Sequence, residues 1–219
     1  MRPHKIRKTG LARSGEATAT AADWSEAALH LIAESGLSAV TVETVANRLG
    51  VTKGSFYWHF RGRSELLAAA LGMWEQRTTT DIIKGLEMET SARRRLEFLL
   101  QAASQPPRPR SMVAALAEGL ADPIVKDVLT RVTSARIGYV EACYRELGAA
   151  PALARSKAVF AYAAYRGLLQ LAREAPAAVL STDWPAYPAL VRDALIPKPR
   201  IKRSATSLGK TPVRGEVVR

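Results

Sequence analysis

The chain has 219 residues, of which 47% are hydrophobic and 24% are charged, and its formal net charge is +12. This length and apolar content suffice for a buried core in one large or two small domains. The one cysteine, Cys143, excludes an internal disulfide and is typical of a reducing compartment. No apolar run approaches the about 20 residues that cross a bilayer, and the basic N-terminus lacks the apolar stretch of a secretory signal. We therefore expect a cytoplasmic protein that makes no contact with a membrane.

The positive charge is concentrated at the two ends of the chain. Residues 1–22 contain five basic residues and one acid, residues 197–219 contain seven and one, and the body between them contains 20 and 18. Basic ends on a near-neutral body favour an anionic polymer as partner, although such ends can also serve solubility alone. We expect a basic N-terminal arm over 1–19 and a basic disordered tail over 198–219.

In the body, apolar residues recur mostly every three to four positions, which predicts an all-α protein. The first predicted helices form a compact unit over 20–78. In this unit Thr41 caps a second helix that Gly50 stops, and Thr52 caps a short third helix. A fourth helix begins near Ser64 and runs towards the end of the unit. Further helices are expected over 92–104, 111–121, 124–147, 152–175 and 187–196.

The second and third helices, over about 41–60, have the form of a helix-turn-helix, which places its second helix in the major groove of DNA. The segment 48–63 contains no carboxylate but has four cations, namely Arg48, Lys53, Arg61 and Arg63. Such a local excess of positive charge is expected of a surface that faces phosphates.

Aromatic residues follow the first turn of the predicted third helix. Phe56 and Phe60 are four positions apart and should point into the core, whereas Tyr57, Trp58 and His59 lie on the other faces. The phenol and the imidazole can donate hydrogen bonds to phosphates. The alternative is that all of these rings are core residues. That alternative is weaker for the last three, because so short a helix cannot bury every face.

The order and spacing of these residues resemble a known family. Residues 24–71 are similar to the N-terminal DNA-binding domain of the TetR family of bacterial transcriptional regulators. The matching positions are Ala28, Gly36, Thr41-Val42, Val45-Ala46, Gly50-Val51, the run Gly54-Ser55-Phe56-Tyr57-Trp58-His59-Phe60, Arg63 and Leu66-Leu67. One departure is Arg63, where the family usually has lysine, and another is the basic, flexible pair Arg61-Gly62.

The resemblance implies DNA contacts at six of these positions, and the recognition segment itself adds Thr52 and Trp58. The expected DNA-binding residues are therefore Thr41, Thr52, Lys53, Ser55, Tyr57, Trp58, His59 and Arg63.

The resemblance also implies that residues 79–197 form an all-helical domain for effector binding and dimerisation. Its last two long helices would make a four-helix bundle with those of a second copy. The apolar face of 152–175, with small residues that allow close approach, suits this role, although it could also belong to a buried helix within one chain. The expected interface residues are Phe160, Ala164, Gly167, Leu171, Tyr187, Leu190, Val191 and Leu195.

An effector pocket would use the larger residues of this domain. Their rings and few charges favour a small apolar or aromatic effector over a sugar phosphate. The candidates are Trp74, Met112, Tyr139, Tyr144, Tyr162 and Tyr165, each of which could instead be a core residue.

The residues that catalysis would need are scattered along the chain. The three histidines lie far apart, and there is no Cys-x-x-Cys spacing, no His-Glu-x-x-His spacing and no glycine-rich phosphate loop. We therefore expect no catalytic site, no metal and no cofactor. Cys143 could be a redox sensor or an inert core residue.

These observations predict a transcriptional regulator that is not an enzyme. We expect a homodimeric repressor that binds a palindromic operator in double-stranded DNA and is released by the effector. Two alternatives stay open. One is a DNA-binding regulator without an effector, which acts as an activator or answers to a protein partner. The other is a small-molecule carrier or enzyme with a vestigial helix-turn-helix.

Overall fold

The computed structural model describes residues 19–107 and 112–197, and within these ranges every regular element is a helix, which confirms the predicted all-α class. The predicted basic tail and all but the last residue of the predicted N-terminal arm lie outside the described residues. Over the described ranges, no helix is both long and apolar enough to span a membrane.

The elements in chain order are α1 (Ala21–Ser35), η1 (Leu37–Ala39), α2 (Val42–Leu49), α3 (Lys53–Phe56), α4 (Arg63–Glu75), the π-helical turn η2 (Gln76–Thr80), α5 (Asp81–Glu87), α6 (Ala92–Ala103), α7 (Met112–Glu118), α8 (Pro123–Glu146), α9 (Pro151–Glu174), α10 (Pro176–Leu180) and α11 (Tyr187–Leu195).

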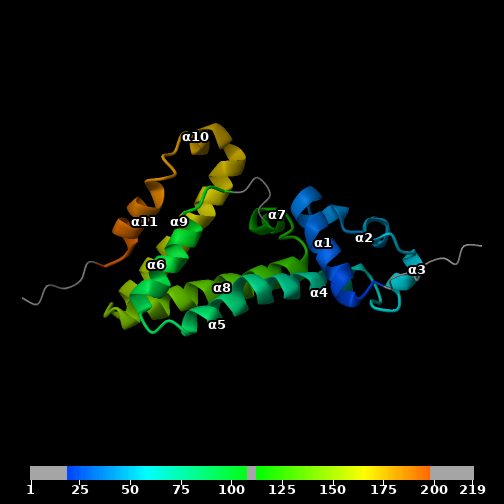
Figure 1. Ribbon diagram of the computed structural model, residues 1–219, viewed down its shortest axis with the longest axis horizontal. Coiled ribbons are helices and arrows are strands. Elements are labelled where there is room, and N and C mark those ends of the chain that lie inside the picture. The colour runs from blue at the N-terminus through cyan, green and yellow to red at the C-terminus, as the bar shows by residue number, and fades with distance from the viewer. Residues whose placement is uncertain (1–18, 108–111, 198–219) are drawn as a thin grey trace, which may run out of the picture.

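The helices α4, α5 and α8 run along the long axis of the molecule, and α9, α10 and α11 project away from it (Figure 1). Figure 1 shows α4 and α8 lying side by side along this axis, with α1, α2 and α3 gathered at one end. The chain turns back from the far end of α8 into α9, which diverges from α8, and α11 then packs against α6. The elements of the predicted helix-turn-helix therefore stand at one extreme of the molecule, and α4 joins them to the rest.

A first hydrophobic core holds the N-terminal unit together. Trp24 of α1 and Phe56 of α3 are fully buried, with ring centroids 5.2 Å apart in an edge-to-face arrangement. Leu66 and Leu71 of α4 are buried in the same cluster, which also reaches α7 and the start of α8. Full burial of each such side chain contributes about 1.5–3 kcal/mol, so α3 is fixed mainly by its one inward ring.

The ends of α2 follow the sequence prediction. The Thr44 amide donates to Thr41 Oγ1 at 3.1 Å, and the Thr41 amide donates to Thr44 Oγ1 at 3.0 Å, so the two residues cap each other. Gly50 ends the helix in the left-handed conformation, with φ 68°. Thr52 precedes α3 as expected, but its side chain makes no cap bond. Instead its carbonyl oxygen accepts from Ser55 Oγ at 2.7 Å.

The fourth helix differs from the prediction at its end. It begins at Arg63, one residue before the expected start, and does not stop near Thr78. It passes through the π-helical turn and continues as α5 to Glu87. Within the turn, the Thr78 hydroxyl donates to the Trp74 carbonyl at 2.8 Å. Threonine hydroxyls that bond to backbone carbonyls widen or bend a helix without ending it.

A second core joins α6, α8, α9 and α11. Leu96, Cys143, Tyr144 and Leu195 are buried in it, and the Tyr144 hydroxyl donates to the Leu195 carbonyl at 2.9 Å. Burial raises the pKa of the Cys143 thiol, which favours the inert core residue over the redox sensor. The helix α10 was not predicted. Pro176 starts it where we expected a break, because proline is tolerated at the first helical position.

Two glycine substitutions test the backbone conformation at the turn between α2 and α3, one within the turn and one in α4 as a comparison. Alanine at Gly50 would meet no surrounding atom within 4 Å, so Gly50→Ala isolates the strain of the left-handed conformation. We expect it to lower the free energy of unfolding by about 1–2 kcal/mol. Gly72→Ala in α4, where a Cβ is equally free, should raise it by up to about 1 kcal/mol. Urea unfolding followed by circular dichroism measures both, and equal effects would contradict the assigned turn.

Candidate nucleic-acid interface

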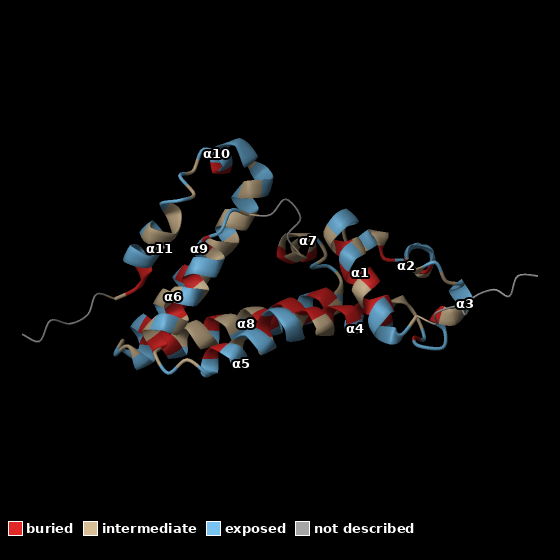
Figure 2. Cartoon of the chain, viewed as in Figure 1, coloured by how far each residue is buried: buried red, intermediate tan, exposed pale blue. Residues whose placement is uncertain are grey.

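The turn that follows α3 exposes rings that the N-terminal core does not use. Phe56 is fully buried and Phe60 is 5% exposed, whereas Tyr57 is 66% and Trp58 87% exposed. His59 is also exposed. Figure 2 shows the end of the molecule around α2 and α3 with mostly exposed residues. The predicted division between inward and outward rings is therefore observed, because one turn of helix can turn only one face to the core.

The exposed phenol is held in place by its neighbour. The Tyr57 ring stands edge-on to the buried Phe56 ring, with centroids 5.2 Å apart and an angle of 85° between the planes. Aromatic pairs in this arrangement contribute about 0.5–1.5 kcal/mol beyond their buried area. The Tyr57 hydroxyl is thus presented from a fixed ring, which favours specific contacts over loose ones.

The first turn of α3 adds a hydroxyl and a cation. The Ser55 hydroxyl gives its proton to the Thr52 carbonyl, so its lone pairs stay available to a donor such as an adenine or cytosine amino group. Lys53 Nζ lies 2.8 Å from Glu43 Oε2. This hydrogen bond and the lysine charge lower the pKa of the Glu43 carboxyl. Both side chains are exposed, and such a surface pair opens at little cost.

Thr41 lies across the turn from α3. Its side chain is exposed and caps α2, and a cap hydroxyl of this kind can also meet a phosphate at the edge of a groove.

Arg63 departs from the expected DNA contacts. Its Nε donates to the Val40 carbonyl at 2.7 Å, its Nη2 donates to the Leu37 carbonyl at 2.9 Å, and its Nη1 lies 3.8 Å from Asp122 Oδ2. The guanidinium therefore joins the loop before α2 to the start of α4 and to the residue that caps α8. The structure gives Arg63 a positioning role, and we leave it out of the DNA contacts proposed below.

The charge of the basic segment 48–63 is partly neutralised, which was not predicted from the sequence. Carboxylates come to it from other elements: Arg48 makes two hydrogen bonds with Glu34 of α1, at 2.7 and 2.8 Å. Lys53 and Arg63 have the acidic partners described above. A count of charges along the segment could not find these partners, because they lie 10 or more residues away in the sequence.

An apolar cavity of about 360 Å³ lies among η2, α5, α6, α8 and α9. Three of the six predicted pocket residues line it, namely Tyr139, Tyr162 and Tyr165. The Tyr162 hydroxyl lies 3.3 Å from Thr133 Oγ1. The lining residues that the sequence analysis missed include Arg136, Phe98 and Ile82. An apolar residue at helical spacing does not show whether a cavity or a neighbour lies opposite it.

The other three predicted pocket residues lie elsewhere. Trp74 is buried beneath the Arg136 guanidinium, whose carbon lies 5.7 Å from the centre of the indole ring. Met112 packs against the first core. Tyr144 is enclosed in the second core, where burial raises its pKa to about 12. These positions are corrected to core residues.

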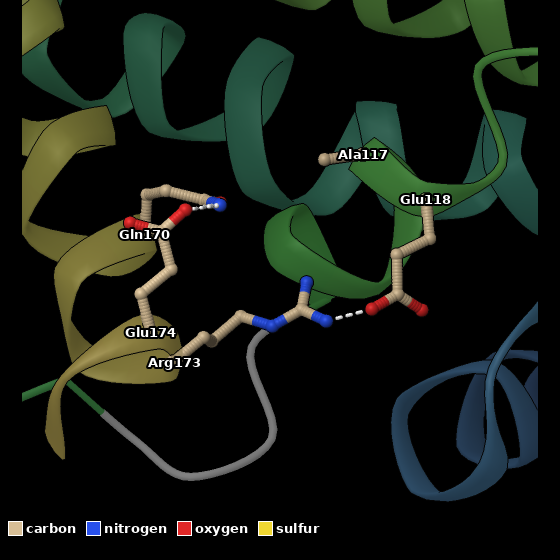
Figure 3. Close-up of a pocket in the computed structure, with 5 residues that line it drawn as sticks. All are labelled: Ala117, Glu118, Gln170, Arg173 and Glu174. Atoms are coloured by element: carbon tan, nitrogen blue, oxygen red, sulfur yellow. Dashed lines mark hydrogen bonds and ion pairs between the residues drawn. The ribbon is translucent and has the colours of Figure 1, made fainter.

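A second hollow, between α7 and α9, is open and polar (Figure 3). Arg173 forms an ion pair with Glu118 there and donates to the Ala114 carbonyl at 2.9 Å. Gln170 donates to Glu174 at 2.6 Å. Since these polar groups bind one another, this hollow is a weaker ligand site than the apolar cavity.

The predicted interface residues divide into two groups. Phe160 and Leu171 of α9 are 63% and 51% exposed, and Ala164 and Gly167 are exposed between them. Leu190 of α11 is 65% exposed.

The remaining predicted interface residues face their own chain. Tyr187 packs edge-on against Trp184 at 5.3 Å between ring centres, and Val191 packs against the second core. Leu195 is only 6% exposed. Leu195 is therefore corrected to a core residue, because a buried side chain cannot contact a second copy.

The comparisons with known proteins agree with this architecture. Residues 26–70 match the sequence model of the bacterial regulatory proteins of the tetR family. The HTH-type transcriptional regulator SrpR of Pseudomonas putida is 33% identical over 81 residues, which are 37% of this chain and 38% of that protein. The chain thus matches well under half the length of this curated relative.

Likeness of the fold extends further along the chain. The crystal structure of a transcriptional regulator from Rhodococcus sp. Rha1 has a TM-score of 0.62 at 23% identity, over 81% of this chain and 92% of that one. The regulator FadR from Bacillus subtilis, in complex with stearoyl-CoA, has a TM-score of 0.58 at 14% identity, over 81% and 98%. The sequence match over 26–70, the curated relative and the shared fold all support the TetR family of bacterial transcriptional regulators.

Proposed function

We propose that the protein is a homodimeric repressor that binds a palindromic operator through α2 and α3 and is released by a small apolar effector. The observation that supports this most directly is the C-terminal end of α3, where Phe56 is buried and the next two residues, Tyr57 and Trp58, are exposed. Large exposed rings on a short helix at the end of a molecule mark an interaction surface.

The chemistry of this surface suits duplex DNA. The Tyr57 hydroxyl and the Lys53 ammonium can bind phosphates and so set the register of the protein on the duplex. Ser55 presents acceptor lone pairs at the first turn of the helix that a helix-turn-helix places in the major groove. The residues of the proposed contact surface are Thr41, Thr52, Lys53, Ser55, Tyr57, Trp58 and His59, without Arg63.

The exposed face of α9 supports the second part of the proposal. Phe160, Ala164, Gly167 and Leu171 follow the spacing of one helical face and stay exposed in the single chain. Small residues between the two large ones allow another helix to approach closely. A second copy that covers this face, together with Leu190 of α11, would form a two-fold dimer and present two α3 helices to a palindrome.

The apolar cavity supports the third part. It borders η2, which is continuous with α4, and α4 carries the helix-turn-helix. A ligand that favours a different position of α4 would lower DNA affinity by its difference in binding free energy between the two states, typically about 1–3 kcal/mol. The complex of FadR with stearoyl-CoA supports the idea that this fold can hold a ligand with a long apolar part.

Selection of bound DNA from a random pool tests the DNA contact. We expect a palindromic site, and Lys53→Ala and Tyr57→Ala should each weaken binding to it. Loss of one phosphate contact in each half-site should lower the slope of log affinity against log salt by about 0.9 per contact. Gel shift or fluorescence anisotropy between about 50 and 200 mM salt measures this slope.

Lys84→Ala is the matched control. This lysine is exposed on α5, towards the other end of the long axis from α3, so its removal should leave the slope unchanged. Equal losses for Lys53→Ala and Lys84→Ala would mean that the protein binds DNA by net charge alone. No preference for any duplex at low salt would refute the proposed contact surface.

A charge on the exposed face of α9 tests the dimer. Phe160→Glu would bury a carboxylate in the proposed interface, so we expect monomers at protein concentrations at which the wild type is dimeric. Sedimentation equilibrium measures this change. Met88→Glu is the control, since Met88 is 85% exposed and lies between α5 and α6. If both variants stay dimeric, the interface lies elsewhere.

A further inference from the structure

The apolar cavity contains one cation that has no acidic partner. Arg136 lines the cavity and forms no ion pair with any carboxylate in the described parts of the chain. Arg131, on the same helix, contrasts with it, because Arg131 pairs with both Glu75 and Asp127. A guanidinium beside a mainly apolar cavity, without a compensating carboxylate, attracts an anion strongly because the local dielectric constant is low.

The Arg136 guanidinium is held by the π-helical turn instead. Its Nε donates to Thr79 Oγ1 at 3.0 Å, and its Nη2 donates to the Thr78 carbonyl at 3.1 Å and to Thr78 Oγ1 at 3.2 Å. Its flat face lies over the Trp74 ring, and the Tyr165 phenol lies beside it. Arg136 of α8 therefore fastens the turn that continues α4 into α5.

The rest of the lining sets the shape of a ligand. Apart from Arg136, two threonines and three phenols, the lining residues are aliphatic side chains and Phe98. Arg95 lies next to Tyr139, does not line the cavity, and is already paired with Glu146. A phosphate dianion would leave one charge uncompensated in apolar surroundings, whereas a monoanion is matched by the single guanidinium. An apolar body with one carboxylate fits both requirements.

We infer that the effector is an apolar or aromatic carboxylic acid, that Arg136 binds its carboxylate, and that this contact releases the π-helical turn from α8. This inference rests on the proposed function, because it names the effector class of the same cavity. It adds a residue that selects the ligand and a step that follows from the geometry of arginine.

That step depends on the Nη2 atom. A carboxylate can bind a guanidinium with two parallel hydrogen bonds, either to Nη1 and Nη2 or to Nε and Nη2. Both arrangements use Nη2, which donates to both the carbonyl and the hydroxyl oxygen of Thr78 in the unliganded protein. A bound carboxylate therefore competes with Thr78 for this nitrogen, and in the Nε arrangement it also competes with Thr79.

Pairs of ligands that differ only in the carboxylate measure its contribution to binding. We would titrate the full-length protein by calorimetry with straight-chain alkanoates of six to fourteen carbons and with 1-naphthaleneacetate, each beside its primary amide. The acid and its amide have nearly the same shape and apolar area, so their difference reports the charge-assisted bonds. We expect the best acid to bind about tenfold or more tightly than its amide. Equal affinities, or no binding by any acid of the series, would overturn the inference.

Two arginine variants test whether the preference for the acid over its amide depends on Arg136. In Arg136→Gln the preference for the acid should fall to about twofold or less, since the amide side chain keeps hydrogen bonds but has no charge. Arg131→Gln, on the same helix, should keep the full preference. Thermal unfolding in the absence of ligand shows whether each variant is folded. A preference that persists in folded Arg136→Gln would overturn the assignment, and if that variant does not fold, the acid–amide comparison on the wild type still decides the ligand class.

Hydrogen exchange tests the release of the turn. Amide exchange over 76–81 should become faster when the acid is bound and stay unchanged with its amide. Tight acid binding without faster exchange there would overturn the release step. None of these measurements uses DNA, so a failure of the proposed DNA contact and a failure of the acid site give different results.

Discussion

The structure of the helix-turn-helix end depends on one packed contact, between Phe56 of α3 and Trp24 of α1. α3 has only four residues and too few internal hydrogen bonds to hold itself, so tertiary packing must fix it. With Phe56 buried at the end of α3, the turn that follows the helix leaves Tyr57 and Trp58 exposed. The recognition surface is thus a consequence of core packing on the opposite side of the same turn, and its stability belongs to the whole N-terminal unit.

A second constraint is the placement of the basic side chains. Arg63 donates hydrogen bonds to the carbonyls of Leu37 and Val40, and these bonds fix the loop before α2 against α4. Such charge-assisted bonds to part-buried carbonyls contribute about 1.5–3 kcal/mol each, more than an exposed ion pair does. In the proposed interface, Arg63 therefore keeps the helix-turn-helix rigid, whereas Lys53 binds phosphate.

Most helices could be predicted from the sequence because local signals define them. The reciprocal cap of Thr41 and the left-handed Gly50 determine α2, and the prediction for α11 ended one residue late. The continuation of α4 through η2 was missed, since a π-helical turn needs no breaker. The candidate site was predicted less well. Which tyrosines face a cavity, and which carboxylates neutralise the segment 48–63, depends on contacts between elements far apart in the sequence.

The same distant contacts determine how the two halves of the chain can influence each other. The end of α4 and the turn after it are fastened on two sides, by Glu75 to Arg131 of α8 and by Arg77 to Glu26 of α1. Arg136 is the third fastening, and of the three only this one lines the apolar cavity. The Arg77–Glu26 pair is exposed and contributes little, whereas Arg131 binds the part-buried Glu75 with two hydrogen bonds. The bonds of Arg136 to the π-helical turn are therefore where occupancy of the cavity can act most directly on the position of α4.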